Sequence, residues 1–487
     1  MKLVTSILLL LILTTSSVAA DWSFKIRYSK EVRDKPFTGR VLVMFTSGTR
    51  EPRTGPNWFR PEQFLAVQVK NWKPNTDLTI TPKSEMQSYP KPLAELSLKG
   101  TRAQVVARFN AHARQAGRGP GNGYSNVVKL DEPKQVEFTI DKIVQSRRFT
   151  ETKWTKLLAV RSKLLSKFHA RDVMMRASVT LPASYYEKKD RRYPVIYQVP
   201  GFGGTHHGRA RRQPLKERNN DGVEFIRVVL DPTSPLGHHV FADSANNGPV
   251  GKALISEFIP RLEKKYRGIG KPYARLLTGH SSGGWSSLWL QVTYPDFFGG
   301  TWSTAPDPVD FRDFQQINMY EPKQNLYRNR KGKTRPLARM RGRVILTFPG
   351  FDSMEWTVGP GGQLHSFEAV FSPRGDDGKP QLAWDRKTGK VNRKVVEHWK
   401  KYDIRLIMET NWKTLGPKLK GKIHVIMGGA DTFYLDGASR LLKKSLAKLS
   451  DDPVVEIYEG KTHFDLMTRK LRKRIYDEMV EAVKKGR

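Results

Sequence analysis

The sequence of 487 residues contains no cysteine, and it is poor in acidic side chains. The missing cysteine excludes disulfide scaffolds, thiol catalysis and cysteine-bound metal centres. Asp and Glu number 47 against 85 Lys and Arg, which gives a formal charge of +38 at pH 7. This excess favours anionic neighbours such as acidic polymers, but it does not define any chemistry. Hydrophobic residues make up 38% of the chain, so a folded core is expected.

Long apolar runs are also absent. Lys2 precedes a short apolar stretch from Ile7 to Leu13, and small residues follow as far as Ala20. This order predicts a signal peptide at residues 1–20, cleaved near Ala20. The stretch is shorter than the roughly 18 residues that cross a bilayer, and no later segment is more apolar. We therefore expect a secreted or periplasmic protein with no membrane span.

The region 21–149 is typical of a β-rich, sandwich-like N-terminal domain. Short strand patterns alternate with turns that are rich in proline and glycine. We expect strands at 24–28, 39–45 and 135–140, and one helix around 101–116. No catalytic motif stands out in this accessory domain.

From residue 150 to 487 the pattern predicts an α/β domain, with a mostly parallel sheet flanked by helices. Buried-strand runs alternate here with amphipathic helical segments. The alternation is lost at about 311–420, which we interpret as an insertion able to cover a site. We expect strands at 173–181, 195–199, 225–230, 275–278, 300–303, 423–427 and 454–458, and helices at 252–266, 284–293, 437–448 and 465–484.

A candidate nucleophile lies in the segment Gly279-His280-Ser281-Ser282-Gly283-Gly284, between an expected strand and an expected helix. A serine on such a tight turn needs small residues two positions before and two positions after it. Gly279 and Gly283 meet this requirement for Ser281. Ser282 would need a small residue at His280, so Ser281 is the better candidate.

A serine nucleophile needs a base that is oriented by an acid, and in this type of fold the order is serine, acid, histidine. Asp431 follows the expected strand 423–427, and His463 follows the strand 454–458. Both lie at the same edge of the sheet as Ser281. Asp436 stays open as an alternative acid, although it suits the start of a helix. Asp465 is too close to His463 in sequence to be its partner.

Candidates for oxyanion and substrate binding come from neighbouring loops. The backbone N–H of Ser282 is one expected oxyanion donor, and the N–H of Phe202 is expected to be the second donor, with Gly203 as the next choice. The loop 200–204 is rich in glycine, which permits close approach of its backbone to a substrate oxygen. Four residues near this edge are candidates for substrate contact: His206, Asn246, Asn247 and His280.

The chain from about residue 150 to its end resembles the esterase D-type branch of the α/β-hydrolase superfamily. The resemblance is carried by the segments 193–197, 200–204 and 279–284, with Asp431 and His463. This branch includes feruloyl and acetyl xylan esterases, S-formylglutathione hydrolase, enterochelin esterases and mycolyltransferases. Pro200 stands where many relatives have a histidine. This difference leaves the expected oxyanion donor intact, because the donor is a backbone N–H group. The resemblance implies a serine ester hydrolase that works through an acyl-enzyme.

The substrate expected from these features is a carbohydrate-linked or other acyl ester. Neither a cofactor nor a metal is expected, because adjacent histidines such as 206–207 and 238–239 point opposite ways in an extended segment. Basic runs at 328–333 and 469–474 suit either an anionic extracellular polymer or plain solvation. A nucleic-acid partner is not expected. Two alternatives stay open: an acyltransferase with the same triad, and a non-catalytic binder of anionic polymer on a hydrolase scaffold.

Overall fold

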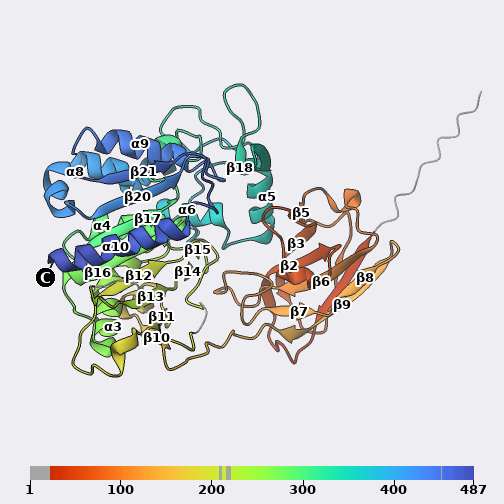
Figure 1. Cartoon of the computed structure of the whole chain (residues 1–487). Coiled ribbons are helices and arrows are strands. Elements are labelled where there is room, and N and C mark those ends of the chain that lie inside the picture. Colours follow the sequence, from red (N-terminus) through yellow and green to blue (C-terminus); the bar gives the residue numbers. More distant parts are fainter. Residues whose placement is uncertain (1–21, 208–210, 215–220, 451, 487) are drawn as a thin grey trace, which may run out of the picture. The chain divides into compact units, whose positions relative to one another are not determined.

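The computed structural model describes residues 22–207, 211–214, 221–450 and 452–486 (Figure 1). The predicted signal peptide at 1–20 lies outside the described residues. The chain divides into two compact units. The first takes in the described residues up to Asn57, with Glu62–Phe109 and Gly123–Ile143. The second takes in Trp58–Pro61, Asn110–Asn122 and Val144–Arg487, so two short segments from the N-terminal region belong to it.

The first unit is β-rich, as predicted. Its described strands form one hydrogen-bonded sheet in the order β4-β1-β9-β7-β6-β2-β3-β5, with β8 also paired to β6. Aromatic and aliphatic side chains such as Phe24, Phe45 and Phe138 form its core. The strand bounds are β1 Ser23–Tyr28, β2 Phe37–Thr46, β3 Phe64–Trp72, β4 Leu78–Ile80, β5 Gln87–Tyr89, β6 Thr101–Ala107, β7 Gly123–Ser125, β8 Val128–Leu130 and β9 Gln135–Ile143.

The helix predicted around 101–116 is wrong. Residues Thr101–Ala107 form β6, which pairs antiparallel with β2. Alternate side chains of this segment, Ala103, Val105 and Ala107, enter the core of the unit. This period of two matches a strand, and sheet pairing therefore overrode the helical preference of its alanine, arginine and glutamine residues.

The second unit has the α/β architecture that the alternating pattern predicted. Its sheet has the strand order β10-β11-β13-β12-β16-β17-β20-β21. From β13 to β21 all neighbours are parallel, and β10 and β11 add an antiparallel edge. The strand bounds are β10 Thr155–Arg161, β11 Met174–Thr180, β12 Val195–Val199, β13 Ile226–Leu230, β16 Arg275–His280, β17 Gly300–Thr304, β20 Ile423–Gly428 and β21 Val454–Tyr458.

Helices cover both faces of this sheet (Figure 1). Val195, Tyr197 and Val199 of β12 pack into one apolar cluster, together with residues of the helical segment that ends in α3. Ile196, between them in sequence, packs into a second cluster that contains the apolar side of α10. Strands buried on both faces therefore appear as continuous apolar runs, which made them visible in the sequence.

The four helices predicted in the second unit start near their predicted positions, with one exception at the C-terminal end. Asp465 accepts hydrogen bonds from the N–H and hydroxyl of Thr462, so the chain turns there and α10 begins only at Arg469. The helix bounds are α1 Lys163–Phe168, α2 Val250–Ala253, α3 Ile259–Tyr266, α4 Ser282–Thr293, α5 Phe348–Val358, α6 Gln363–Phe371, α7 Arg393–Trp399, α8 Ile404–Leu419, α9 Asp436–Leu446 and α10 Arg469–Gly486, with a π-helical turn Leu254–Phe258 between α2 and α3.

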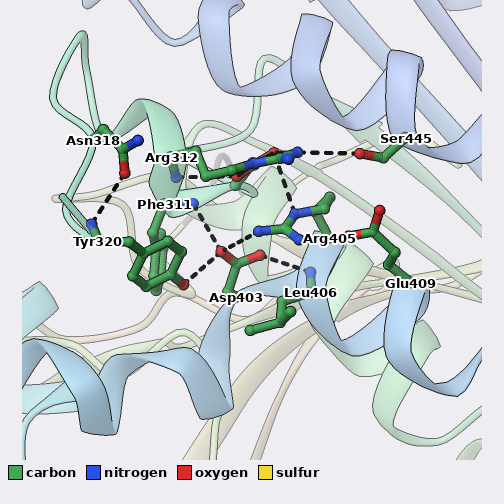
Figure 2. A network of polar contacts seen from close by, with 10 residues as sticks. Phe311, Arg312, Asn318, Tyr320, Asp403, Arg405, Leu406, Glu409 and Ser445 are labelled. Atoms are coloured by element: carbon green, nitrogen blue, oxygen red, sulfur yellow. Dashed lines mark hydrogen bonds and ion pairs between the residues drawn. The ribbon is translucent and has the colours of Figure 1, made fainter.

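The segment between β17 and β20 holds α5 to α8 and one short hairpin, β18 Pro336–Met340 with β19 Arg343–Thr347. Another short hairpin, β14 Thr233–Ser234 with β15 Gly237–His238, follows β13 earlier in the chain. A buried polar network fastens this segment (Figure 2). Asp403, at the start of α8, accepts hydrogen bonds from the N–H groups of Phe311 and Leu406 and from the hydroxyl of Tyr320. Arg405 ion-pairs with Asp403 at 3.5 Å. Hydrogen bonds and ion pairs of this kind order the segment that covers the sheet edge.

Among the described residues, no helix has the length and apolar character that a membrane-spanning segment requires.

Candidate active site

Ser281 occupies the sharp turn between β16 and α4. Its backbone angles are φ 61° and ψ −128°, a conformation that costs energy for any residue with a side chain. The turn is held in place from both sides, because Ser281 N–H donates to Thr304 O at 3.0 Å and Ser281 O accepts from Trp285 N–H at 3.0 Å. Such a strained, well-supported turn presents the serine hydroxyl at the edge of the sheet.

The glycines on either side of Ser281 are sterically required. A Cβ at Gly279 would lie 2.0 Å from the carbonyl oxygen of Gly283. A Cβ at Gly283 would lie 2.0 Å from the carbonyl oxygen of Val199, at the end of β12. Neither contact is possible for a real side chain, so the spacing seen in the sequence has a direct physical cause.

His463 and Asp431 lie against each other at the same edge. His463 Nδ1 and Asp431 Oδ2 are 2.7 Å apart, and both side chains are buried. The other carboxylate oxygen, Oδ1 of Asp431, accepts the N–H groups of Phe433 and Leu435. Asp436 instead bonds to arginines 339 and 440. The geometry therefore favours Asp431 over Asp436 as the partner of His463.

A second carboxyl group, Asp307, faces the serine from the loop after β17. Ser281 Oγ donates to Asp307 Oδ1 at 3.5 Å, and Ser282 Oγ donates to Asp307 Oδ2 at 2.5 Å. Gln363, at the start of α6, donates to Ser282 Oγ at 3.0 Å. Burial raises the pKa of Asp307 to about 6. This acid was not among the site residues predicted from the sequence, although its position just after a parallel strand was a usable signal.

Ser281, His463 and Asp307 line a cavity of about 270 Å³ whose remaining walls are largely apolar. Trp58 stacks on Phe202 with ring centroids 5.1 Å apart, and Phe59 stacks on Phe433 at 6.1 Å. Trp58 and Phe59 were not among the site residues predicted from the sequence either. The other lining residues are Gly201, His280, Gln315, Leu337, Leu346, Phe351, Gln363, Leu364, Phe367, Leu435 and Phe464.

The glycine-rich loop after β12 approaches the nucleophile closely. A Cβ at Gly201 would lie 3.2 Å from Ser281 Cβ and 3.0 Å from the carbonyl oxygen of His280. Gly203 has φ +84°, which a side chain would strain. His238 Nε2 donates to the carbonyl oxygen of Pro200 at 2.9 Å, because the buried ring has its Nδ1 occupied as acceptor of a backbone N–H. This loop is therefore in position to offer backbone donors near Ser281.

Of the four residues considered for substrate contact, His280 alone is among the residues that line this cavity. Its ring packs against that of His463 with centroids 4.6 Å apart, and burial lowers its pKa to about 4. His206 bonds to Asp231 Oδ2 at 2.6 Å. Asn246 and Asn247 donate to carbonyl groups at the end of α6. These contacts give the last three residues local bonding partners within the fold.

Comparison with known proteins locates a family match in the second unit. The family model described as "Putative esterase" matches residues 170–433, which is more than half of the chain. No curated protein matches the chain.

Solved structures also align with the chain. A ferulic acid esterase aligns with 15% identity and a TM-score of 0.39, over 68% of this chain and 98% of that one. An S-formylglutathione hydrolase from Agrobacterium tumefaciens aligns with 15% identity and a TM-score of 0.39, over 68% of this chain and 94% of that one. Fluorophosphonate-binding serine hydrolase F of Staphylococcus aureus aligns with 11% identity and a TM-score of 0.36, over 68% and 98%.

Proposed function

The chain belongs to the "Putative esterase" family and is a carboxylic ester hydrolase of the α/β-hydrolase fold, and we propose that Ser281, His463 and Asp431 perform its reaction. The observation that carries this proposal is the 2.7 Å contact between His463 and Asp431 beside a cavity that Ser281 also lines. Because Asp431 occupies Nδ1 of His463, the other ring nitrogen is left to exchange a proton with the serine.

The proposed reaction has two halves. In the first, Ser281 Oγ bonds to the ester carbonyl carbon while His463 takes the hydroxyl proton. The carbon–oxygen bond to the alcohol then breaks, and His463 returns the proton to the leaving alcohol oxygen. In the second half, water attacks the acyl-enzyme in the same way and releases the acid. Asp431 keeps the imidazole oriented and stabilises it when it is charged.

The negative oxygen of each tetrahedral intermediate needs preorganised donors. The N–H groups of Ser282 and Phe202, with Gly203 as the alternative, are proposed for this task. The position of Gly201 supports the assignment, since the loop lines the same cavity as Ser281 and a Cβ at Gly201 would crowd the nucleophile. The helix N-terminus after Ser281 adds favourable potential for the same charge.

The walls of the cavity support an apolar or aromatic acyl group as the preferred half of the ester. Aromatic rings and leucines dominate the lining, so an acyl chain gains about 25 cal/mol for each Å² of apolar surface that it buries there. A carbohydrate-linked ester suits the alcohol side. We further propose that the protein is exported after loss of residues 1–20, where its basic surface meets anionic extracellular polymers.

The central experiment is hydrolysis of p-nitrophenyl acetate by the wild type and by Ser281→Ala. The variant should lose activity by up to about 10⁶-fold. Ser256→Ala serves as the matched control, because Ser256 is exposed and bonds only locally, through Lys252 O. Equal rates in wild type and Ser281→Ala would refute the esterase mechanism. If the wild type is inactive but binds an acidic polysaccharide in a salt-sensitive way, the alternative of a non-catalytic binder of anionic polymer would be favoured.

An acyltransferase is the second candidate. The apolar side chains that the segment between β17 and β20 contributes, Leu337, Leu346, Phe351, Leu364 and Phe367, favour it because they exclude water from the acyl-enzyme. Product analysis with a sugar acceptor present separates the two reactions. Transfer products in excess over free acid would support the transferase, whereas free acid alone would support the hydrolase.

A further inference from the structure

The second unit contains another cavity, of about 280 Å³, whose character is opposite to that of the cavity at Ser281. Its walls come from the segment that contains His112 and Arg114, the region between α1 and β11, and the loop after β13. The basic residues on its wall are His112, Arg114, His169, Arg171, Arg176 and His239. This volume is near the lower end of the range for sites that take small molecules.

The two acidic residues on the wall already have partners. Asp172 forms an ion pair with Arg161, whose Nε lies 2.6 Å from the carboxylate. Asp231 forms hydrogen bonds with His206 and Thr233. Arg171 and Arg176 make no ion pair within the described parts of the chain. Their guanidinium groups donate to the backbone carbonyl oxygens of Asp172 and Met174, at 3.3 Å and 3.5 Å. The cavity thus keeps positive charge that the wall does not neutralise.

The surroundings of two histidines of the wall lower their pKa and so favour the neutral ring. Burial, followed by the charge of Arg171, lowers the pKa of His112. Burial also lowers the pKa of His169, whose Nε2 donates to Asn247 O at 3.2 Å. Arg171, Arg374 and His112 are the charged or titratable groups that act on His169. A bound anion would reverse this effect, because it favours the protonated form of both rings.

The walls of the basic cavity and of the cavity at Ser281 meet at Arg114. The guanidinium carbon of Arg114 lies 4.9 Å from the ring centroid of Phe202, which lines the cavity at Ser281. Arg114 itself lines the basic cavity. One cation–π contact therefore joins the two walls at the loop that is proposed to stabilise the oxyanion.

We propose that the basic cavity is a binding site for an oxyanion group, a carboxylate, sulfate or phosphate, and that this group is carried on the alcohol half of the ester substrate. The planar forks of Arg171 and Arg176 suit such groups, since guanidinium binds two oxygens at once. The second clause rests on the proposed function, whereas binding of the anion itself does not. A free anion in solution offers the same chemistry, so the experiment has one arm for each source.

The first arm measures binding of inorganic sulfate by calorimetry to the Ser281→Ala protein, in which no ester chemistry occurs. Adding Arg171→Ala or Arg176→Ala should weaken binding by about tenfold each, the usual effect of one lost charge-assisted hydrogen bond. Adding Lys167→Ala, which removes one exposed cation of α1 outside the cavity, is the matched control. Absent binding, or equal weakening in all three variants, would overturn the site.

A second readout separates a specific site from general surface charge. Sulfate should raise the NMR-measured pKa values of His112 and His169, and its affinity should increase from pH 8 to pH 5 as both rings take up protons. Arg171→Lys should retain part of the affinity, because a point charge replaces the fork. Histidine pKa values that do not respond to sulfate would contradict the proposal. The other charged or titratable groups of the wall are Arg114, Asp172, Arg176, Asp231 and His239.

The second arm compares two acetate esters, of glucuronic acid and of glucose. In Arg171→Ala the ratio of kcat/KM for the acidic ester to kcat/KM for the neutral ester should fall by about tenfold. The fall should arise from a higher KM for the acidic ester, with kcat unchanged. Lys167→Ala should keep the wild-type ratio. Sulfate binding with an unchanged ratio would assign the site to a free anion and overturn its role in substrate recognition. Loss of the proposed esterase function would leave the sulfate arm intact, so the two failures are distinguishable.

Discussion

The two cavities of the second unit differ in how they treat charge. In the apolar cavity, burial raises the pKa of Asp307 to about 6 and so favours its neutral acid form. In the basic cavity, burial and neighbouring arginine lower the pKa of His112 and His169 and so favour the neutral base. Both sites therefore disfavour isolated charge in their resting state. They differ in what a ligand would bring: a developing oxyanion in one, a permanent anion in the other.

This difference suggests a division of labour on either side of one loop. Phe202 faces the apolar cavity, while Arg114 covers its ring from the basic one. Bond cleavage benefits from a water-poor cavity in which oriented donors act strongly. Recognition of an anion benefits from arginine forks that need no proton transfer. Variants in each cavity should therefore affect different measurements.

After the loss of Ser281 itself, the largest expected effect tests whether catalysis belongs to the apolar cavity. Asp431→Asn should lower kcat/KM for p-nitrophenyl acetate by about 10³ to 10⁴-fold, because the amide removes the charge that stabilises the His463 imidazolium. Asp436→Asn is the matched control, since Asp436 pairs with arginines 339 and 440 instead. A greater loss in the control than in Asp431→Asn would transfer the acid role to Asp436.

The second prediction concerns Glu355 of α5, which interacts with one residue of each cavity. Its carboxylate accepts the N–H of Gln363, whose side chain reaches Ser282, and its charge acts on Arg114. Burial raises the pKa of Glu355 from 4.5 to about 7. A raised carboxyl pKa means that the folded state binds the proton more tightly, so this contribution to stability is present at pH 4.5 and is lost as pH rises through 7.

The wild type should therefore lose more unfolding free energy between pH 5 and pH 8 than Glu355→Gln does, by up to about 3 kcal/mol. The full effect is expected because the Glu355 side chain is only 3% exposed. Denaturant titrations of both proteins at each pH provide the measurement. Groups shared by the two proteins cancel in this comparison. Parallel pH curves would show that Glu355 does not carry the linkage.

Much of the second unit could be predicted because its signals are local. Parallel strands buried on both faces appear as apolar runs, and Ser281 is marked by the glycines that its turn requires. Asp431 and His463 follow such strands, so their common edge could be inferred. The prediction of a helix around 101–116 was wrong because it used only the local residue preferences of the segment. The pairing of this segment with β2 is a long-range contact, which those preferences do not reveal.

The remaining site residues depend on contacts that a single sequence does not reveal. Trp58 and Phe59 lie more than 140 residues before the glycine-rich loop, and only the fold brings Trp58 onto Phe202. Asp307 resembles any acid in a loop until its bonds to Ser281 and Ser282 are known. The same holds for His112 and Arg114, which join the basic cavity from a segment assigned by sequence to the accessory domain.

The third prediction tests the electrostatic role of Asp307. The charge of His463 lowers the pKa of Asp307, against the larger effect of burial, so the two groups interact across the cavity. Asp307→Asn should lower kcat/KM by about tenfold at pH 8 and shift the acidic limb of the pH profile to lower pH. Asp313→Asn is the matched control, because burial also raises the pKa of Asp313 to about 6 while its carboxylate bonds to Gln316. Identical pH profiles in Asp307→Asn and wild type would remove Asp307 from the mechanism.

The smallest expected effect concerns the acyl group. Trp58→Ala removes one aromatic wall of the apolar cavity, and a long acyl chain loses buried surface there whereas an acetyl group barely reaches it. The ratio of kcat/KM for p-nitrophenyl octanoate to that for the acetate should fall about fivefold, equivalent to roughly 1 kcal/mol of lost apolar burial. Trp412→Ala, on α8, controls for the loss of a tryptophan elsewhere. An unchanged ratio would mean that acyl selectivity arises from the other walls of the cavity, and a ratio that rises would mean that Trp58 obstructs long chains rather than binding them.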